Sequence, residues 1–216
     1  MIKQFNRLMT AVAVLLLASS AFAQPERYVA GTHYIELTPA VRTGNPEKIE
    51  VVEAFWYGCG HCFRFEPLIV NWSENLPDDV EFVRFPAQWN AIMQVHAQVY
   101  YTAEALGVLD RLHEPAFNAI NVEGNRLQNE KQIGDLFAKY GVNADDFKAA
   151  FNSFSVRTKV NQGAKRMQDY QVRSTPNMIV NGKYLIATGE AVPTQEELLK
   201  VVDFLVQKER QARNSG

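Results

Sequence analysis

Runs of apolar, β-branched and aromatic residues mark the places where the chain can form strands. The longest run, 49–57, is interrupted only by Glu50 and Glu53. A run of this composition predicts a buried strand in the centre of a sheet. Two shorter runs predict further strands at 34–37 and 80–85.

The segment between the strands predicted at 49–57 and 80–85 has the length of a helix. It covers 59–76 and contains Pro67, which should kink or interrupt the helix because proline lacks a backbone N–H. Strand, helix and strand in this order predict a βαβ unit.

From about residue 87 to residue 170 the apolar residues follow helical spacing. They recur at i, i+3, i+4 and i+7, which predicts amphipathic helices. Gly107 should close the first helix, and 156–170 predicts the last one. The apolar sets are Ile92, Val95, Val99, Ala103 and Leu106; Ile133, Leu136, Phe137 and Tyr140; and Phe147, Ala150, Phe151 and Phe154.

Strand character returns at 177–180 and 184–186. The pair Asn181-Gly182 between these runs favours a type I′ turn, so the segment predicts a β-hairpin. The hairpin should complete the sheet that the helices interrupt.

The last predicted helix begins with a capping box, in which Thr194 is followed three residues later by Glu197. We expect this helix to end near Glu209 and the polar tail 210–216 to fray. The order of elements predicts an α/β fold with a helical insertion. The predicted parts are a signal peptide at 1–23, an α/β domain at 24–86 plus 171–216, and an inserted all-helical domain at 87–170.

The first 23 residues differ in character from the rest of the chain. Lys3 and Arg7 precede an apolar run, 9–17, and the segment ends in the small-residue sequence 21–23. This layout is typical of a cleaved secretory signal peptide. A membrane anchor is the alternative, but a spanning helix needs about 20 apolar residues. The sequence therefore predicts an exported protein.

The net charge is only -2 at pH 7, and acidic and basic residues are interspersed. This pattern does not favour a nucleic-acid partner. Small molecules and proteins remain as candidate partners.

The chain contains two cysteines, and both lie in the sequence Cys59-Gly60-His61-Cys62. A disulfide that closes so short a ring adds little stability, so the pair indicates redox chemistry. Cys59 should lie at the N-terminus of the helix that follows the central strand, where backbone N–H groups lower the pKa of a thiol. Cys62 should lie one turn further in and be more buried.

Two residues between the cysteines are candidate supporting residues. His61 can provide positive charge or a hydrogen bond toward the Cys59 thiolate, which would make the disulfide more oxidising. Gly60 adds no steric bulk, whereas a proline would stiffen the turn, so glycine can change the redox potential.

A metal site and a haem site are the alternatives for a C-x-x-C motif. Zinc is disfavoured because no other cysteine exists and His33, His96 and His113 lack ligand spacing. Haem attachment needs histidine directly after the second cysteine, where Phe63 stands. We therefore expect no metal.

Glu53 and Pro176 are the other candidates outside the motif. Glu53 interrupts the central strand; it could exchange a proton with Cys62, or it could point to solvent on an outer face, and the alternation of residues does not decide between these. Arg84 on the next strand could pair with it. Pro176 precedes a strand and could open it in the trans form or make a specialised cis turn.

The segment Phe55-Trp56-Tyr57-Gly58-Cys59-Gly60-His61-Cys62 resembles the active site of the thioredoxin superfamily. With the signal peptide, the helical insertion, Thr175-Pro176, the segment 181–184 and the final helix, nearly the whole mature chain resembles the DsbA family. The resemblance implies a thioredoxin fold, a central mixed β-sheet flanked by helices, with an inserted all-helical domain.

The resemblance also implies roles for single residues. Cys59 would be the attacked and attacking sulfur, and Cys62 would resolve the mixed disulfide. Pro176 would be cis and face the cysteines, and the backbone at Thr175 would bind substrate as an added strand. Glu53 would match a buried acid. Glu66 would match a nearby acid of lesser importance.

The function implied is that of a periplasmic thiol:disulfide oxidoreductase that donates its disulfide to newly exported proteins. The implied partners are unfolded exported proteins and a DsbB-like membrane oxidase, with no tightly bound cofactor and a monomeric enzyme. Gly60 departs from the proline found in many members of the family, which leaves the redox potential open. The alternatives are a reductase or isomerase using the same cysteines, and a non-catalytic exported chaperone.

Overall fold

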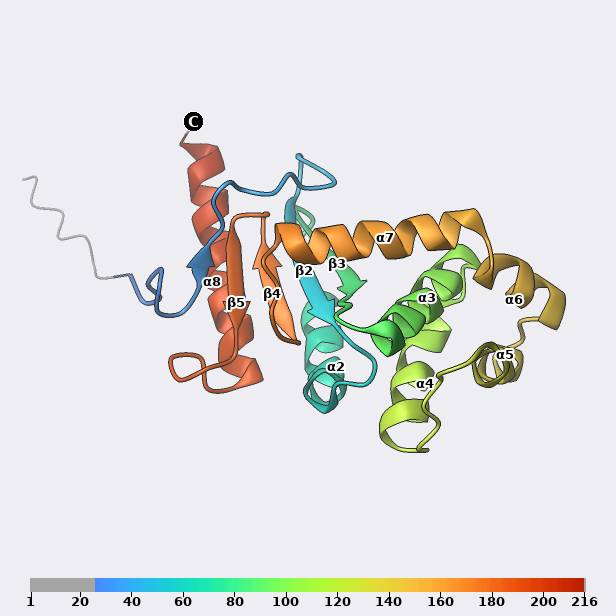
Figure 1. The fold of residues 1–216 in the computed structure, drawn as a ribbon. Coiled ribbons are helices and arrows are strands. Elements are labelled where there is room, and N and C mark those ends of the chain that lie inside the picture. The colour runs from blue at the N-terminus through green and yellow to red at the C-terminus, as the bar shows by residue number, and fades with distance from the viewer. Residues whose placement is uncertain (1–25, 216) are drawn as a thin grey trace, which may run out of the picture.

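The computed structural model describes residues 26–215, and the predicted signal peptide 1–23 lies outside the described residues. The centre is a five-stranded sheet with the order β1-β5-β4-β2-β3 (Figure 1). Strand β2 pairs parallel with β3 and antiparallel with β4, so the sheet is mixed, as predicted. The strands are β1 (Ile35–Glu36), β2 (Ile49–Phe55), β3 (Val80–Pro86), β4 (Asn177–Val180) and β5 (Tyr184–Ala187).

Every residue of β2 is buried because helices cover both faces of the sheet. Val51 packs with Phe65 of α2 (Gly60–Ser73) and Val202 of α8 (Gln195–Asn214). Val52 on the opposite face packs with Tyr170, which follows α7 (Phe154–Asp169). This burial on two faces explains the continuous apolar run in the sequence.

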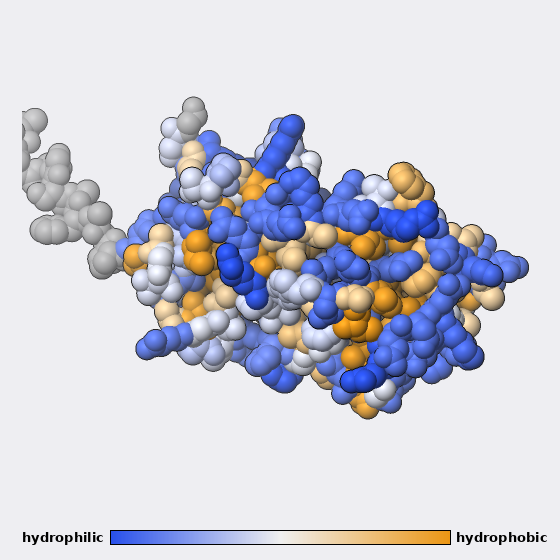
Figure 2. Space-filling model, viewed as in Figure 1, coloured by the Kyte–Doolittle hydropathy of each residue, from blue (hydrophilic) through white to orange (hydrophobic). Residues whose placement is uncertain are grey.

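The helices α3 to α7 lie between β3 and β4 in the chain and form most of one side of the molecule (Figure 1). Helix α7 runs back from them to the sheet. Polar side chains cover most of the face shown in Figure 2, and apolar side chains gather mainly over this helical part. The remaining helices are α3 (Ala91–Ala105), α4 (Leu109–Asn121), α5 (Glu130–Lys139) and α6 (Ala144–Phe151).

Local capping sets the limits of these helices. The side chains of Asn90, Asn129, Asn143 and Ser153 cap α3, α5, α6 and α7 by accepting a backbone N–H of the first turn. The cap at Ser153 begins a new helix, so the prediction that Phe154 shares a face with the apolar residues of α6 is wrong. Phe154 is 78% exposed.

Two other predictions about helices need correction. Helix α2 continues through Pro67, so the predicted interruption at this residue is wrong, whereas a kink stays a prediction. Helix α8 does not fray after Glu209 but extends to Asn214. The reason is long-range contact: Arg210 donates hydrogen bonds of 2.6 and 2.7 Å to Asp79, and Arg213 donates to two backbone carbonyls of the segment before β2. Among the described residues, none of the helices has the length and apolar character needed to cross a membrane.

Gly182 lies where the hairpin between β4 and β5 meets the segment before β2. Its φ of 65° and the φ of 51° at Asn181 fit the predicted type I′ turn. A Cβ atom at Gly182 would overlap the carbonyl oxygen of Val41. The backbone N–H of Val41 also donates a hydrogen bond to the Gly182 carbonyl.

We therefore expect Gly182→Ala to lower the free energy of unfolding by about 3 kcal/mol. Gly31→Ala is the matched control, because Gly31 also has a positive φ of 77° but no atom lies within 4 Å of its added Cβ. It should cost about 1 kcal/mol. Urea denaturation measures both values, and equal losses would contradict the role of the Val41 contact.

Candidate active site

The two cysteines lie at the start of α2, directly after the central strand and one short turn. Cys59 is the N-cap residue of the helix, and its sulfur accepts a hydrogen bond from the backbone N–H of Cys62 at 3.4 Å. Cys62 is fully buried, Cys59 is half-buried, and both are free thiols in this structure. The position predicted for Cys59 at a helix N-terminus is confirmed.

The two thiols have opposite acidities. Hydrogen bonding from the Cys62 thiol, aided by Thr175 and by the backbone N–H groups of Cys62 and His61, outweighs burial and lowers the pKa of Cys59 to about 5. Burial raises the pKa of Cys62 well above its ordinary value. At neutral pH Cys59 is therefore a thiolate and Cys62 a thiol, as the chemistry of a nucleophile with a resolving partner requires.

The loop before β4 meets Cys59 from a distant part of the sequence. The Thr175–Pro176 peptide bond is cis, which settles the two forms that the sequence left open. The Cys59 sulfur lies 3.4 Å from the carbonyl oxygen of Thr175. The backbone predicted to bind substrate is thus in contact with the reactive sulfur.

His61 is exposed, and its side chain contacts Arg64 rather than Cys59. The Nη2 atom of Arg64 lies 3.1 Å from Nδ1 of His61, and the Gln195 side chain donates to the His61 carbonyl at 2.7 Å. The hydrogen bond from His61 that lowers the pKa of Cys59 comes from its backbone N–H. Arg64 was not predicted, although its place three residues after His61 on the same helix put it within reach.

Gly60 is the first residue of α2 and faces the same arginine. A Cβ atom at this position would lie 3.5 Å from Nη1 of Arg64, which is ordinary van der Waals contact. The guanidinium group therefore lies across both residues that separate the cysteines.

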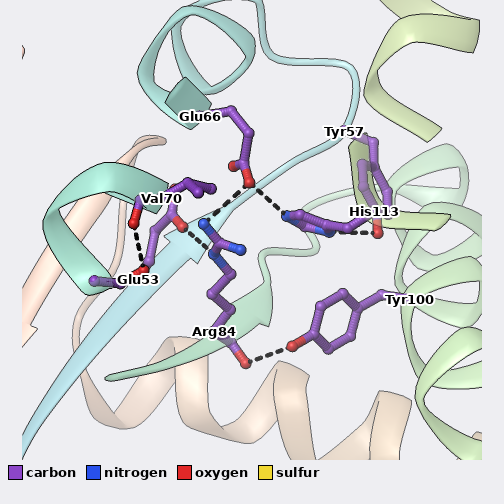
Figure 3. A network of polar contacts seen from close by, with 8 residues as sticks. Glu53, Tyr57, Glu66, Val70, Arg84, Tyr100 and His113 are labelled. Carbon is purple, nitrogen blue, oxygen red and sulfur yellow. Dashed lines mark hydrogen bonds and ion pairs between the residues drawn. The ribbon is translucent and has the colours of Figure 1, made fainter. Parts of the chain in front are cut away.

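Glu53 lies on β2, six residues before Cys59, and is 1% exposed. Strand pairing places it opposite Arg84 of β3, and the Arg84 Nε atom donates to Glu53 Oε2 at 2.8 Å (Figure 3). Burial raises the pKa of Glu53 to about 7, although Arg84 acts in the opposite direction. The alternative in which Glu53 points to solvent is wrong, and its predicted pairing with Arg84 is confirmed.

Arg84 also contacts the second predicted acid. Its Nη2 atom lies 3.1 Å from Oε1 of Glu66, which is buried on α2 (Figure 3). One guanidinium group is thus shared by two carboxylates. Within residues 26–215, we find no cluster of three or more His, Cys, Asp or Glu side chains suited to a metal ion.

A thiolate and a thiol within one helical turn can exchange a disulfide with other thiols. The protein is therefore a dithiol–disulfide oxidoreductase with a thioredoxin fold. A family model described as a DSBA-like thioredoxin domain matches residues 73–200. The chain belongs to the DsbA family.

Similar proteins cover almost the whole chain. The chain is 42% identical over 207 residues to the thiol:disulfide interchange protein DsbA of Pseudomonas aeruginosa. These residues make up 96% of this chain and 98% of the relative. The crystal structure of P. aeruginosa DsbA matches with a TM-score of 0.83 and 44% identity, over 87% of this chain and 97% of that chain. DsbA from Xylella fastidiosa matches with a TM-score of 0.79 and 32% identity, over 85% and 98%.

Proposed function

We propose that the protein works in the periplasm, where it donates the disulfide of Cys59 and Cys62 to newly exported proteins. The observation that carries this proposal is the opposite acidity of the two thiols at one helix N-terminus. A stable Cys59 thiolate favours the reduced protein, and a disulfide whose reduced form is stabilised is a strong oxidant.

The first exchange breaks the bond between the two sulfurs. A substrate thiolate attacks Cys59 and forms a mixed disulfide, and the electron pair of the broken bond goes to the Cys62 sulfur. Because the pKa of buried Cys62 is high, this sulfur takes up a proton. Protonated Glu53, with a pKa of about 7, is the buried acid able to supply it.

The second exchange releases the product. A second substrate thiolate attacks the substrate sulfur of the mixed disulfide, a substrate disulfide forms, and Cys59 leaves as a thiolate. The substrate backbone pairs with Thr175 as an added strand during both steps. Two electrons remain on the dithiol of the enzyme.

Reoxidation of the enzyme transfers these two electrons to a membrane partner. We propose a DsbB-like oxidase that passes them to quinone, so that the enzyme acts as a monomer without a tightly bound cofactor of its own. The redox-active group is the Cys59–Cys62 disulfide.

Gly60 supports a second candidate function. Glycine stands here in place of the proline found in many members of the family, and the residue at this position affects the redox potential. A reductase or isomerase would use the same two sulfurs with a lower potential. The equilibrium with glutathione separates the two functions.

For an oxidant we expect a redox potential less negative than about -180 mV in glutathione buffers. The thiolate absorbance of the reduced protein should titrate with a midpoint near pH 5, because that is the pKa of Cys59. Cys59→Ser is the control that assigns the absorbance change. A lower potential together with an ordinary thiol pKa would mean a reductase and would contradict the proposal.

A further inference from the structure

His113 is a buried histidine on α4 that reaches the residues below the active site. It is 5% exposed. Its Nδ1 atom lies 2.8 Å from the hydroxyl of Tyr57, two residues before Cys59, and its Nε2 atom lies 3.6 Å from Oε1 of Glu66 (Figure 3). A residue of the helical insertion thus contacts both the end of the central strand and α2.

The contacts continue from His113 to Glu53, whose charge acts on Cys62. Glu66 contacts Arg84 at 3.1 Å, and Arg84 donates to Glu53 at 2.8 Å. The side chains form one row from α4 across α2 and β3 to β2, as Figure 3 shows. A change at His113 can therefore reach Glu53 through three contacts in sequence, by way of Glu66 and Arg84.

The protons in this row can be assigned from its chemistry. Burial raises the pKa of Tyr57 well above its ordinary value, so its hydroxyl is protonated and donates to Nδ1 of His113. Burial lowers the pKa of His113, so the ring is neutral at pH 7 and carries its proton on Nε2. The Nε2 atom lies 3.6 Å from Oε1 of Glu66, which is an electrostatic contact and longer than a hydrogen bond, and Nε2 has no hydrogen-bond partner among the described residues.

We propose that His113 is a positioning residue for disulfide exchange. Its ring holds the Glu66 carboxylate and thereby weakens the pairing of Glu66 with Arg84, so that Arg84 pairs more strongly with Glu53. The inference rests on the proposed function, because Glu53 acts there as the proton donor to Cys62. It adds a role for the helical insertion, which supplies the histidine. His113 itself touches neither the substrate nor the reacting sulfurs.

The direction of the effect follows from competition for one guanidinium group. Burial raises the pKa of Glu66, but His113 and Arg84 lower it by more. The pKa is therefore lowered overall, and Glu66 stays ionised at pH 7. Without the electrostatic contact of the His113 ring at 3.6 Å, Glu66 binds Arg84 more strongly, and Glu53 loses part of its pairing. Glu53 then holds its proton to higher pH.

Other charged and titratable groups surround this row of side chains. Arg84, Glu66 and His113 line a groove of about 960 Å³ that is open to solvent. The groups that act on Glu53 or His113 are Cys59 and Cys62 of the active-site turn and α2, Tyr57 after β2, Tyr100 of α3 and Asp110 of α4.

The test is a titration of the Glu53 carboxyl by NMR in the reduced, full-length folded protein with labelled glutamate. In His113→Leu the midpoint should rise by about half a pH unit or more, the equivalent of a weakened charged hydrogen bond. In Glu66→Gln the Glu53 midpoint should fall, because Arg84 then pairs with Glu53 alone. The double variant should match Glu66→Gln, because His113 acts through Glu66.

His113→Gln keeps an N–H donor and should restore part of the wild-type midpoint. His96→Leu is the matched control, since His96 is also a buried histidine of the insertion but bonds to Trp56 and a backbone carbonyl instead; its midpoint should stay unchanged. An unchanged or lowered midpoint in His113→Leu overturns the proposal. If that variant does not fold, a midpoint in Glu66→Gln that is unchanged or raised overturns it.

The same titration separates this inference from the proposed function. The NMR midpoint reports the coupling of His113 to Glu53 without any assay of activity. If the wild-type protein failed to oxidise a dithiol peptide while the midpoints moved as expected, the proposed function would be wrong and the coupling would stand.

Discussion

Cys59→Ser is expected to abolish disulfide exchange while the protein keeps its fold. The thiolate is lost, and a serine hydroxyl neither attacks a disulfide nor forms one. The fold should persist because serine is itself a good N-cap residue and can accept the backbone N–H that Cys59 accepts at the start of α2. Oxidation of a dithiol peptide and a thermal unfolding curve measure the two effects.

Cys62→Ser is the matched variant, because it removes the other sulfur and leaves the nucleophile. It should form a mixed disulfide with a peptide disulfide and then stop, which appears as a mass increase that dithiothreitol reverses. Both variants should still bind an unfolded peptide. Peptide binding without thiol oxidation in the wild-type protein would identify a chaperone and refute the enzyme.

The sequence was sufficient to predict the elements that position the two sulfurs. A buried strand leaves a continuous apolar run, as in β2, and the turn after it puts Cys59 at a helix N-terminus wherever the rest of the chain lies. The hairpin was predictable for a similar reason, since Asn181 and Gly182 encode its turn locally.

Contacts between distant segments could not be predicted from the sequence. The face of Glu53 stayed open because β2 is covered on both sides, so the alternation of residues carries no information. The extent of α8 depends on Arg210 reaching Asp79, 131 residues away along the chain. From the sequence His113 is a candidate only for a metal ligand, because its contact with Glu66 requires the packing of α4 against α2.

Glu53→Gln is expected to slow disulfide donation by about 10²-fold at pH 6, where a buried general acid is lost. Glu53 has a pKa of about 7, so below pH 7 it can protonate Cys62 as the enzyme disulfide opens. As the pH rises through 7, the wild-type rate, corrected for ionisation of the substrate thiol, should fall toward that of the variant. Stopped-flow kinetics between pH 5 and 9 should show these curves converging, and parallel curves would exclude Glu53 as the donor.

The pH dependence of stability gives an independent check on the same group. The pKa of Glu53 is about 7 in the folded protein and near 4.5 for an ordinary glutamate, so between these values the folded state binds more protons than the unfolded state. This contribution is complete below pH 4.5 and is lost as the pH rises through 7, by at most about 1.4 kcal/mol per pH unit. Glu53→Gln cannot titrate and should lack this slope in urea denaturation. A variant with the wild-type slope would mean that Glu53 does not hold a proton in the folded protein, and Glu53 would then be excluded as the proton donor to Cys62.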